Sequence, residues 1–384
     1  MGQVDRWDVI VVGAGLSGLT AAQRLSQSGY RVLVLDKSRG LGGRMATRRV
    51  TWPQDDRETV GAMVAVDHGC RFLQSASPLE ASWLADWIAR GVVQPWNPAE
   101  FTLTLDRQGQ AQLAPSPSQG PYAVAPQGMS AVAKVLATGL TIQRHSRVTQ
   151  VWPQGNGWQV TWVDTAADPT ADPQDNGAVP LEARALLLAI PAAQIIPLMA
   201  EAVVEHGNLA PFLADAEAVS FDPVITVMAG YAHLTAPLTT LDRPQSPPQP
   251  SSGWMIWGQG HPALRWLALD SSKRPQPHYP VVVAHSTATF AEAYFEAPDL
   301  PQVGKQLLGQ AAQVLGDNLT QPTWMQVHRW RYGFVKQAHP AQLLYTEAVP
   351  TLAGCGDWCA GLSAHDAILS GEAAANYLGQ RLGS

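Results

Sequence analysis

Three glycines near the start of the chain, Gly13, Gly15 and Gly18, have the spacing of a loop that binds phosphate. The first permits a tight turn, the second lets the backbone approach a pyrophosphate, and the third lets a helix pack closely on a strand. An apolar helix is expected directly after the loop, so the positive end of that helix would face the phosphate. This spacing predicts a site for a nucleotide diphosphate.

The segments around the glycines complete the pattern. Residues 9–12 are a short β-branched apolar run, which is typical of a strand buried on both faces. A second apolar strand is expected at residues 31–35, and Asp36 follows it. The Asp36 carboxylate can accept hydrogen bonds from ribose hydroxyls. The strand–loop–helix–strand–acid order therefore indicates a dinucleotide site.

A second glycine-rich turn, with Gly40, Gly42 and Gly43, is followed by Arg44. An arginine beside such a turn can neutralise pyrophosphate charge that the first loop only partly screens. This tandem arrangement resembles the FAD-binding N-terminus of flavoproteins of the glutathione-reductase and amine-oxidase type. The resemblance favours non-covalently bound FAD over NAD as the tightly held cofactor.

Later segments resemble amine-oxidase-related flavoproteins, and two phrases resemble their renalase-like branch. Residues 126–137, 147–151, 186–194, 352–359 and 367–378 look like the remaining FAD-domain segments. Residues 265–276 (RWLALDSSKRPQ), 282–296 and 328–334 (HRWRYGF) resemble renalase-like substrate-domain signatures. The resemblance implies an α/β fold, in which a Rossmann-type FAD-binding domain is interleaved with an α+β substrate domain on a mainly antiparallel sheet. The FAD-binding domain is expected at residues 1–72, 126–200 and 350–384, and the substrate domain at 73–125 and 201–349.

The resemblance also implies further cofactor contacts. Val148 would hold the adenine through its backbone, although a core valine has the same sequence signature. Asp357, after Gly356, would bind the ribityl chain or else cap a helix. A helix beginning near Ala364 would direct its positive end at the flavin, but His365 and Asp366 depart from the acid–glycine pair of many relatives. The full expected cofactor-binding set is Gly13, Gly15, Leu16, Ser17, Gly18, Asp36, Lys37, Gly42, Gly43, Arg44, Val148, Gly356, Asp357, Ala367 and Ile368.

The candidates for catalysis lie in the expected substrate domain: His285, His328, Trp266 and Tyr332. His285 and His328 each interrupt an apolar strand, where structural histidines would look the same. Trp266, with Trp254 and Trp257, could line a slot for a planar substrate or belong to the sheet core.

Other polar residues of this region have two interpretations each. Asp67–His68–Gly69 is expected either against the flavin or in a surface turn with a solvated Asp67. Lys273 could pair with Asp270 instead of meeting substrate. Strand alternation places Trp330 and Tyr332 on one face and two arginines on the other, one of them a candidate anion contact.

Composition excludes several classes of function. The chain has 384 residues, a net charge of −6 and no lysine–arginine cluster, which excludes an electrostatic footprint for nucleic acid or an anionic membrane. No apolar run is long enough for a transmembrane helix, and the first residues do not form a secretory signal or a myristoylation motif. Three cysteines fit a reducing, cytoplasmic setting without disulfides, and neither zinc spacing nor a nucleophile triad occurs. A monomer or weak dimer is expected.

The remaining elements are expected as follows. Helices are predicted at 79–91, 128–139, 301–316 and 363–380, a hairpin around Gly155–Gly157, and strands at 186–191 and 323–331. Polar loops are predicted at 105–121, 164–179 and 242–253, two of which would close hairpins.

These observations favour an oxidoreductase that takes a hydride from a small planar reduced substrate onto flavin N5. The renalase-like resemblance implies dihydronicotinamide dinucleotides, NAD(P)H or its 2- and 6-dihydro isomers, with O2 as acceptor and H2O2 as product. A dihydropyridine needs no strong protein base, because its ring nitrogen drives the hydride out. Two alternatives remain: a flavin amine oxidase or desaturase, disfavoured by the scarcity of lysine, and a non-catalytic, FAD-stabilised binding or assembly protein.

Overall fold

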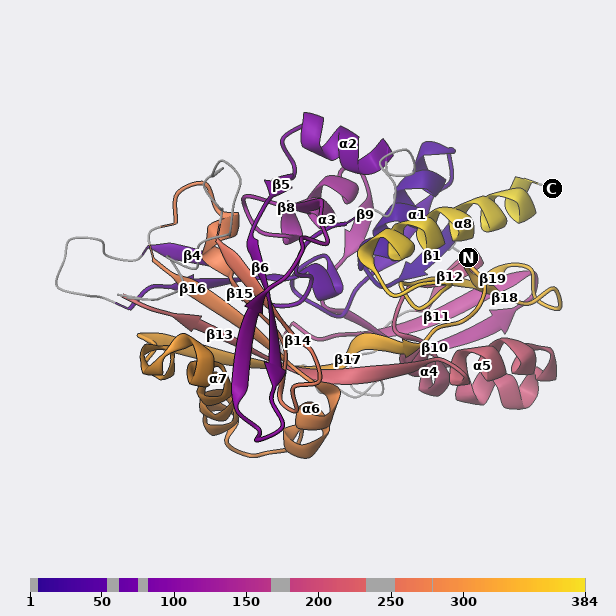
Figure 1. Cartoon of the computed structure of the whole chain (residues 1–384). Helices are drawn as coiled ribbons and strands as arrows, with labels where there is room; N and C mark the ends of the chain where they lie inside the picture. The colour runs from indigo at the N-terminus through magenta and orange to yellow at the C-terminus, as the bar shows by residue number, and fades with distance from the viewer. Residues whose placement is uncertain are drawn as a thin grey trace. The chain divides into compact units, whose positions relative to one another are not determined.

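A computed structural model describes residues 6–53, 62–74, 82–166, 180–232, 253–277 and 279–383. The chain divides into two compact units (Figure 1). Unit 1 comprises Met1–Met45, Val132–Phe221 and Phe334–Ser384, and unit 2 comprises Ala46–Ala131 and Asp222–Gly333.

A parallel sheet forms the centre of unit 1. Its apolar strands pair in the order β19, β12, β1, β2 and β9, each parallel to its neighbour. The strands are β1 (Trp7–Val12), β2 (Val32–Leu35), β9 (Thr141–Gln143), β12 (Leu181–Leu188) and β19 (Leu352–Gly354). Parallel sheets need both faces covered, which agrees with the complete burial of Val9, Ile10 and Val11 in β1.

An antiparallel hairpin and five α-helices accompany this sheet in the described residues of unit 1. Strands β10 and β11 pair around a turn at Gly155 and Asn156, and β11 also pairs antiparallel with β12. The short β18 pairs with β19. The bounds are β10 (Ser146–Gln154), β11 (Gly157–Asp164), β18 (Leu344–Tyr345), α1 (Leu16–Gln27), α3 (Ser130–Leu136), α4 (Ala192–Glu205), α5 (Ala210–Glu217) and α8 (Ala364–Gly383); the first two residues of α3 belong to unit 2.

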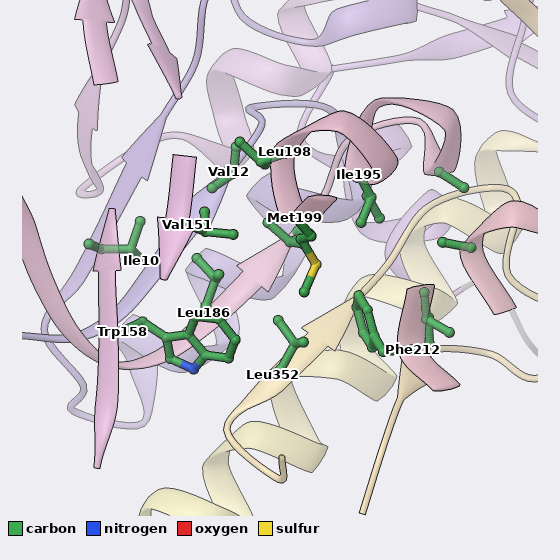
Figure 2. Packing of buried hydrophobic residues seen from close by; sticks show 14 of the residues in the cluster. Ile10, Val12, Val151, Trp158, Leu186, Ile195, Leu198, Met199, Phe212 and Leu352 are labelled. Carbon is green, nitrogen blue, oxygen red and sulfur yellow. The ribbon is translucent and has the colours of Figure 1, made fainter. Parts of the chain in front are cut away.

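The core of unit 1 joins its sheet to α4 and α5. Ile10, Trp158, Leu186 and Met199 are at most 1% exposed and belong to one apolar cluster (Figure 2). Phe212 of α5 belongs to the same cluster and has no exposed surface. Trp158 satisfies its indole N–H by donating to Thr351 Oγ1 at 3.2 Å. The buried polar atom therefore has the partner that burial requires.

Unit 2 is built on a seven-stranded, mainly antiparallel sheet in the order β17, β13, β16, β15, β14, β6 and β7. Only β14 and β6 pair in parallel among its described pairings. The strands are β6 (Ala99–Leu105), β7 (Ala111–Pro115), β13 (Ser220–Gly230), β14 (Trp254–Gly258), β15 (Leu264–Leu269), β16 (Val281–Ser286) and β17 (Trp324–Gln337). The helix α7 (Leu300–Leu315) packs Leu307, Leu308 and Ala311 into the core of this sheet.

Two small strand pairs and two further helices lie in unit 2. Strands β3 (Thr47–Thr51) and β4 (Met63–Asp67) pair with each other, and so do β5 (Gln94–Trp96) and β8 (Tyr122–Val124). The helices are α2 (Ser82–Ala89) and α6 (Ala288–Tyr294). Asp299 and Thr287 cap α7 and α6 through side-chain oxygens that accept a backbone N–H.

The predicted fold class is confirmed: an α/β Rossmann-type part is interleaved with a part on a mainly antiparallel sheet. The predicted loop at 105–121 is wrong in its centre, because residues 111–115 form β7 and pair with β6. The loop at 164–179 begins at the end of β11, and β11 and β12 pair antiparallel as a hairpin requires. Residues 79–81, 167–179 and 242–252 of the predicted helix and loops lie outside the described residues.

The bounds of the two compact units differ from the predicted domain boundaries. Residues 46–72 fall in unit 2, where β3 and β4 pair with each other and Asp67 bonds to Asp270. Residues 126–131 also fall there, and Met129 N–H donates to Asp67. Residues 201–221 and 334–349 fall in unit 1, because Phe212, Val335 and Leu344 belong to its core.

None of the helices within the described residues is both long enough and apolar enough to cross a membrane.

We expect Phe212→Ala to lower the free energy of unfolding by about 3–5 kcal/mol, since the ring is fully buried and its loss leaves a cavity. Urea unfolding followed by circular dichroism measures this. The control is Val204→Ala in α4, whose side chain is 85% exposed, and we expect a change within about 0.5 kcal/mol. Equal effects of the two substitutions would contradict the assigned core.

Candidate functional site

The first glycine-rich turn of unit 1 has the geometry that its spacing predicts. Gly13 has φ of +108°, and a Cβ there would lie 2.5 Å from Ala189 O. A Cβ on Gly18 would lie 2.2 Å from Gly13 O, so α1 and the turn approach too closely for a side chain. A Cβ on Gly15 would meet nothing within 4 Å. Open space therefore lies beside Gly15, whereas the protein backbone fills the space beside Gly13 and Gly18.

The open space beside Gly15 lies at the N-terminus of α1, where no side chain caps the helix. Gly15 is the N-cap of α1 and supplies no side-chain hydrogen bond to the first turn. The N–H groups of a helix's first turn have no partner within the helix. Such a terminus carries a partial positive charge and binds phosphate well. The Leu16 and Ser17 side chains are buried, so only their backbone could contribute here.

The second turn lies directly against the first. Gly42 N–H donates to Ala14 O at 2.9 Å, and Gly15 and Gly42 form an isolated parallel bridge. Gly42 and Gly43 both have positive φ, of +102° and +54°. A Cβ on Gly43 would lie 3.6 Å from Gly15 Cα. The two predicted turns are therefore one backbone assembly.

Asp36 connects β2 to this assembly. Its carboxylate accepts N–H bonds from Ala14 at 2.6 Å and from Ser38 at 2.7 Å, one on each oxygen. Each oxygen keeps a further lone pair that could accept a ribose hydroxyl. The Asp36 carbonyl accepts from Ser146 N–H at 2.8 Å, which anchors the start of β10, the strand that holds Val148. The Lys37 side chain is exposed.

Arg44 and Asp357 form an ion pair at 2.5 Å, although they are 313 residues apart in sequence. Asp357 follows Gly356, whose N–H donates to Ser370 Oγ of α8 at 3.1 Å. The predicted pyrophosphate and ribityl contacts thus meet one another in unit 1. The glycine cradle, the open helix end and this pair fit the diphosphate and sugar hydroxyls of a dinucleotide.

The N-terminus of α8 explains the unusual His365–Asp366 pair. Asp366 Oδ2 accepts the N–H groups of Ser363 and Leu362 at 2.9 and 3.0 Å, and Ser363 Oγ accepts Asp366 N–H at 3.3 Å. This is a capping box, which satisfies donors at both ends of the first turn. Asp366 is therefore a helix cap, while His365, Ala367 and Ile368 are buried in the same turn.

Unit 2 contains a buried network of charges. Asp270 Oδ1 lies 2.6 Å from Lys273 Nζ, and Asp67 Oδ2 lies 2.8 Å from Arg274 Nη2. Arg274 also lies 3.4 Å from Asp270, and the Asp67, Asp270 and Lys273 side chains have no exposed surface. The interpretation of Asp67 as a solvated surface residue is wrong. Lys273 pairs with Asp270, as the alternative interpretation of the sequence has it.

The network stabilises ionised Asp67. Burial by itself raises the pKa of Asp67, but Arg274, Lys273 and hydrogen bonds from Met129 N–H and Thr47 Oγ1 hold that pKa below its usual value. Thr47 and Met129 donate to Oδ1 at 2.7 and 2.8 Å. The carboxylate thereby ties β3, the start of α3 and the segment after β15 together.

Two histidines and a tryptophan lie beside this network. The His68 ring is 5.0 Å from the His328 ring and 5.2 Å from the Trp330 ring, and Trp330 Nε1 donates to His68 O at 3.0 Å. Burial, assisted by the positive charge of Arg48, lowers the pKa values of His68 and His328 to about 4. Both imidazoles are therefore neutral at pH 7.

His285 and Trp266 belong to the same cluster. The two residues pair across β15 and β16, and their rings lie 5.1 Å apart. Burial, then Arg71 and Lys273, lower the pKa of His285 well below its usual value, and the ring hydrogen-bonds the backbone of His68. His285, His328 and Trp266 thus lie in one cluster around His68.

The predicted faces of β17 can be checked against its contacts. Tyr332 is half-buried on the face of β17 that alternation predicts. Arg329 donates to Phe295 O at 2.6 Å and Arg331 to Glu296 Oε1 at 2.9 Å, so both arginines bind the end of α6 and the residues after it. Trp254 belongs to the sheet core.

Comparison with known proteins identifies the family. Residues 100–378, more than half of the chain, match the family described as flavin containing amine oxidoreductase, and residues 11–85 match an NAD(P)-binding Rossmann-like domain. The chain belongs to the flavin-containing amine oxidoreductase family. It is a flavin-dependent oxidoreductase.

Solved structures support the fold of this flavoprotein. A putrescine oxidase bound to putrescine has a TM-score of 0.66 at 15% identity, covering 97% of this chain and 98% of that one. Cyclohexylamine oxidase from Brevibacterium oxydans has a TM-score of 0.66 at 12% identity, covering 99% and 100%.

Similarity to curated proteins is local. An L-amino-acid oxidase of Echis ocellatus is 52% identical over 42 residues, which is 11% of this chain and 8% of that protein. A thiamine thiazole synthase of Aeropyrum pernix is 60% identical over 38 residues, covering 10% and 14%. Such short matches leave the substrate open.

Sequence reasoning missed two features of unit 2. Arg71 enters the aromatic cluster, with its guanidinium carbon 4.9 Å from the centre of the Trp257 ring. Arg274 completes the charge network, and its spacing from Asp270 and Lys273 was a signal for it. Across the described residues, no group of three or more His, Cys, Asp or Glu side chains is arranged to bind a metal.

We expect Gly15→Val to weaken flavin binding about tenfold or more while leaving the fold intact, since the space beside Gly15 is open, unlike that beside Gly13 and Gly18. Gly18→Val should instead destabilise the fold by at least about 1–3 kcal/mol, because its Cβ meets the Gly13 carbonyl. Flavin titration followed by absorbance, with urea unfolding of the flavin-free protein, separates the two effects. Unchanged flavin affinity in Gly15→Val would refute the phosphate assignment.

We expect Asp67→Asn to lower the free energy of unfolding by about 3–5 kcal/mol at pH 7, because Arg274 and Lys273 lose a buried counter-charge. The control Asp86→Asn breaks an exposed pair with Arg90 and should cost at most about 1 kcal/mol.

The same variant has a pH signature. The folded pKa of Asp67 lies below the unfolded value of 3.8, so its contribution is complete above that pH and is lost as the pH falls toward the folded pKa. Urea unfolding between pH 2 and pH 6 should give a flatter stability curve for Asp67→Asn than for the parent. Parallel curves would count against ionised Asp67.

Proposed function

We propose that the chain binds FAD non-covalently and oxidises a small planar reduced substrate, a dihydronicotinamide dinucleotide such as NAD(P)H or its 2- or 6-dihydro isomers. The glycine assembly and the Arg44–Asp357 pair supply contacts for the diphosphate and sugar of FAD. Burial raises the pKa values of Cys355 and of Cys359, the latter to about 12, which keeps the thiols beside Asp357 protonated and favours non-covalent binding.

Bound FAD would supply the acceptor for a hydride, and O2 would take the two electrons onward to give H2O2. The protein's part is to bind, orient and desolvate the substrate. We assign this part to unit 2, with Trp266, His285, His328 and Tyr332 as substrate contacts, as the sequence predicts. His68 joins them because its ring contacts the rings of His328 and Trp330.

One observation favours a dihydronicotinamide over an amine: the charge state of the unit 2 cluster. Its histidines are neutral, and Arg71 and Lys273 both lower the pKa of His285. The Asp67 and Asp270 carboxylates are already paired with Lys273 and Arg274. A protonated amine would thus lie near Arg71 without a counter-charge from Asp67 or Asp270, whereas a neutral dihydropyridine needs neither a carboxylate nor a base.

A flavin amine oxidase is the second candidate, favoured by the family's description and by fold neighbours that oxidise amines according to their names. The renalase-like phrases argue for the first candidate. We also propose a cytoplasmic protein, in keeping with its free cysteines.

Anaerobic mixing of the yellow holoenzyme with each reductant tests the proposal. We expect NADH, NADPH or a 2- or 6-dihydro isomer to bleach the flavin absorbance, and simple amines to leave it unchanged. Admission of O2 should then restore the colour with one equivalent of H2O2.

Bleaching by simple amines alone would establish the second candidate. Bleaching by none of these compounds would favour a binding or assembly role.

A further inference from the structure

Arg71 is a cation surrounded by aromatic rings. Its guanidinium carbon lies 4.9 Å from the centre of the Trp257 ring, 5.6 Å from Trp266 and 5.7 Å from Phe72. Arg71 is half-buried, and so are Trp257 and Phe72, whereas Trp266 is 1% exposed. Aromatic rings this close to a guanidinium stabilise its charge by cation–π attraction.

The rings around Arg71 are held in place by Glu100, which is 4% exposed. Glu100 Oε2 accepts from Trp257 Nε1 at 3.2 Å and from Tyr122 Oη at 3.0 Å, and its other oxygen accepts from Gln119 N–H at 2.9 Å. The Tyr122 ring lies 4.3 Å from the Phe72 ring. The aromatic surround is therefore a built structure, not a chance contact.

The charge on Arg71 is maintained at a cost. Burial, and next the nearby Arg265, lower the pKa of Arg71 to about 10, which still leaves it protonated at neutral pH. Lys273 Nζ also lies 5.8 Å from the centre of the Trp266 ring, but its charge is paired with that of Asp270. A half-buried cation among rings and neutral imidazoles attracts an anion more strongly than an exposed arginine does.

We propose that Arg71 recognises an oxyanion of the substrate, a phosphate or a carboxylate, and so determines specificity for anionic over neutral substrates. The planar guanidinium can donate two parallel hydrogen bonds to such a group, which lysine cannot do. The proposal deepens the proposed function, because a dihydronicotinamide dinucleotide carries phosphates. It also applies to the amine alternative, in which the anionic substrate would be an amino acid.

The test compares an anionic substrate with its neutral counterpart in holoenzyme. The pairs are NADH with a neutral N-alkyl dihydronicotinamide, and amino acids with their decarboxylated amines. We expect Arg71→Gln to raise KM for the anionic member about 10- to 100-fold and to leave KM for the neutral member unchanged. Arg71→Lys should lie between Arg71→Gln and the parent.

The control variant is Arg90→Gln, which removes an exposed arginine of unit 2 paired with Asp86. It should behave as the parent does with both members of each pair. Equal KM changes for the anionic and neutral members in Arg71→Gln, at full flavin content, would show a structural role and overturn the proposal.

A binding measurement keeps the inference separate from the proposed function. Calorimetric titration of holoenzyme with NAD+ and with inorganic diphosphate, in the parent and in Arg71→Gln, needs no turnover. Weaker binding of either ligand to the variant would support recognition of a phosphate by Arg71. A rise in KM for amino acids, with no rise for their decarboxylated amines, would support recognition of a carboxylate. The variant could instead bind both ligands as tightly as the parent and show equal KM changes for the anionic and neutral members of each pair. Arg71 would then not recognise an oxyanion, whichever substrate the enzyme oxidises.

Discussion

The hydrogen bond from Gly42 N–H to Ala14 O joins two turns that are almost thirty residues apart into one backbone surface, to which we assign the diphosphate of the cofactor. The contact requires backbone to meet backbone, and a Cβ on Gly42 would already lie 3.0 Å from Ala133 Cβ. Because this bond fixes the second turn, it also fixes Arg44, which reaches Asp357 from the other end of the chain. The three segments of unit 1 are thereby brought to one place by a local backbone constraint.

Unit 2 is organised by a different constraint, the need of buried charges for partners. Asp67 is the last residue of β4, whereas Asp270, Lys273 and Arg274 follow β15, so neither segment could be buried without the other. Their pairing removes the Asp67 and Asp270 carboxylates from binding other cations. In the proposed function, the positive charge of Arg71 and the neutral histidines favour anionic or neutral planar ligands.

The nucleotide-binding half was predictable because local rules specify it. Gly13, Gly18 and Asp36 have their roles from spacing alone, and the structure shows steric reasons for each glycine. The unit 2 network was not predictable to the same extent, because ion pairs such as Lys273–Asp67 span about two hundred residues and leave no periodic signal. The helix α4 was missed, since Pro197 within it contradicts helix propensity; burial of Ile195, Met199 and Ala202 outweighs that cost. The bounds of the two compact units are hard to predict for a related reason, because a segment's unit depends on its partners and not on its composition.

Family membership and cluster chemistry constrain the substrate in different ways. The amine-oxidase fold supplies a flavin-binding unit and a sheet with aromatic side chains, but a likeness at 12–15% identity shows the fold alone. Specificity must then come from residues such as Arg71, whose charge is costly to bury among Trp257, Trp266 and Phe72. The surrounding rings stabilise this charge in the protein, and a bound oxyanion would stabilise it further. Burial, and then the charges of Arg71 and Lys273, lower the pKa of His285, so its imidazole is suited to hydrogen bonding and stacking, not to accepting a proton at neutral pH. A substrate that releases hydride without losing a proton to the protein fits that limitation.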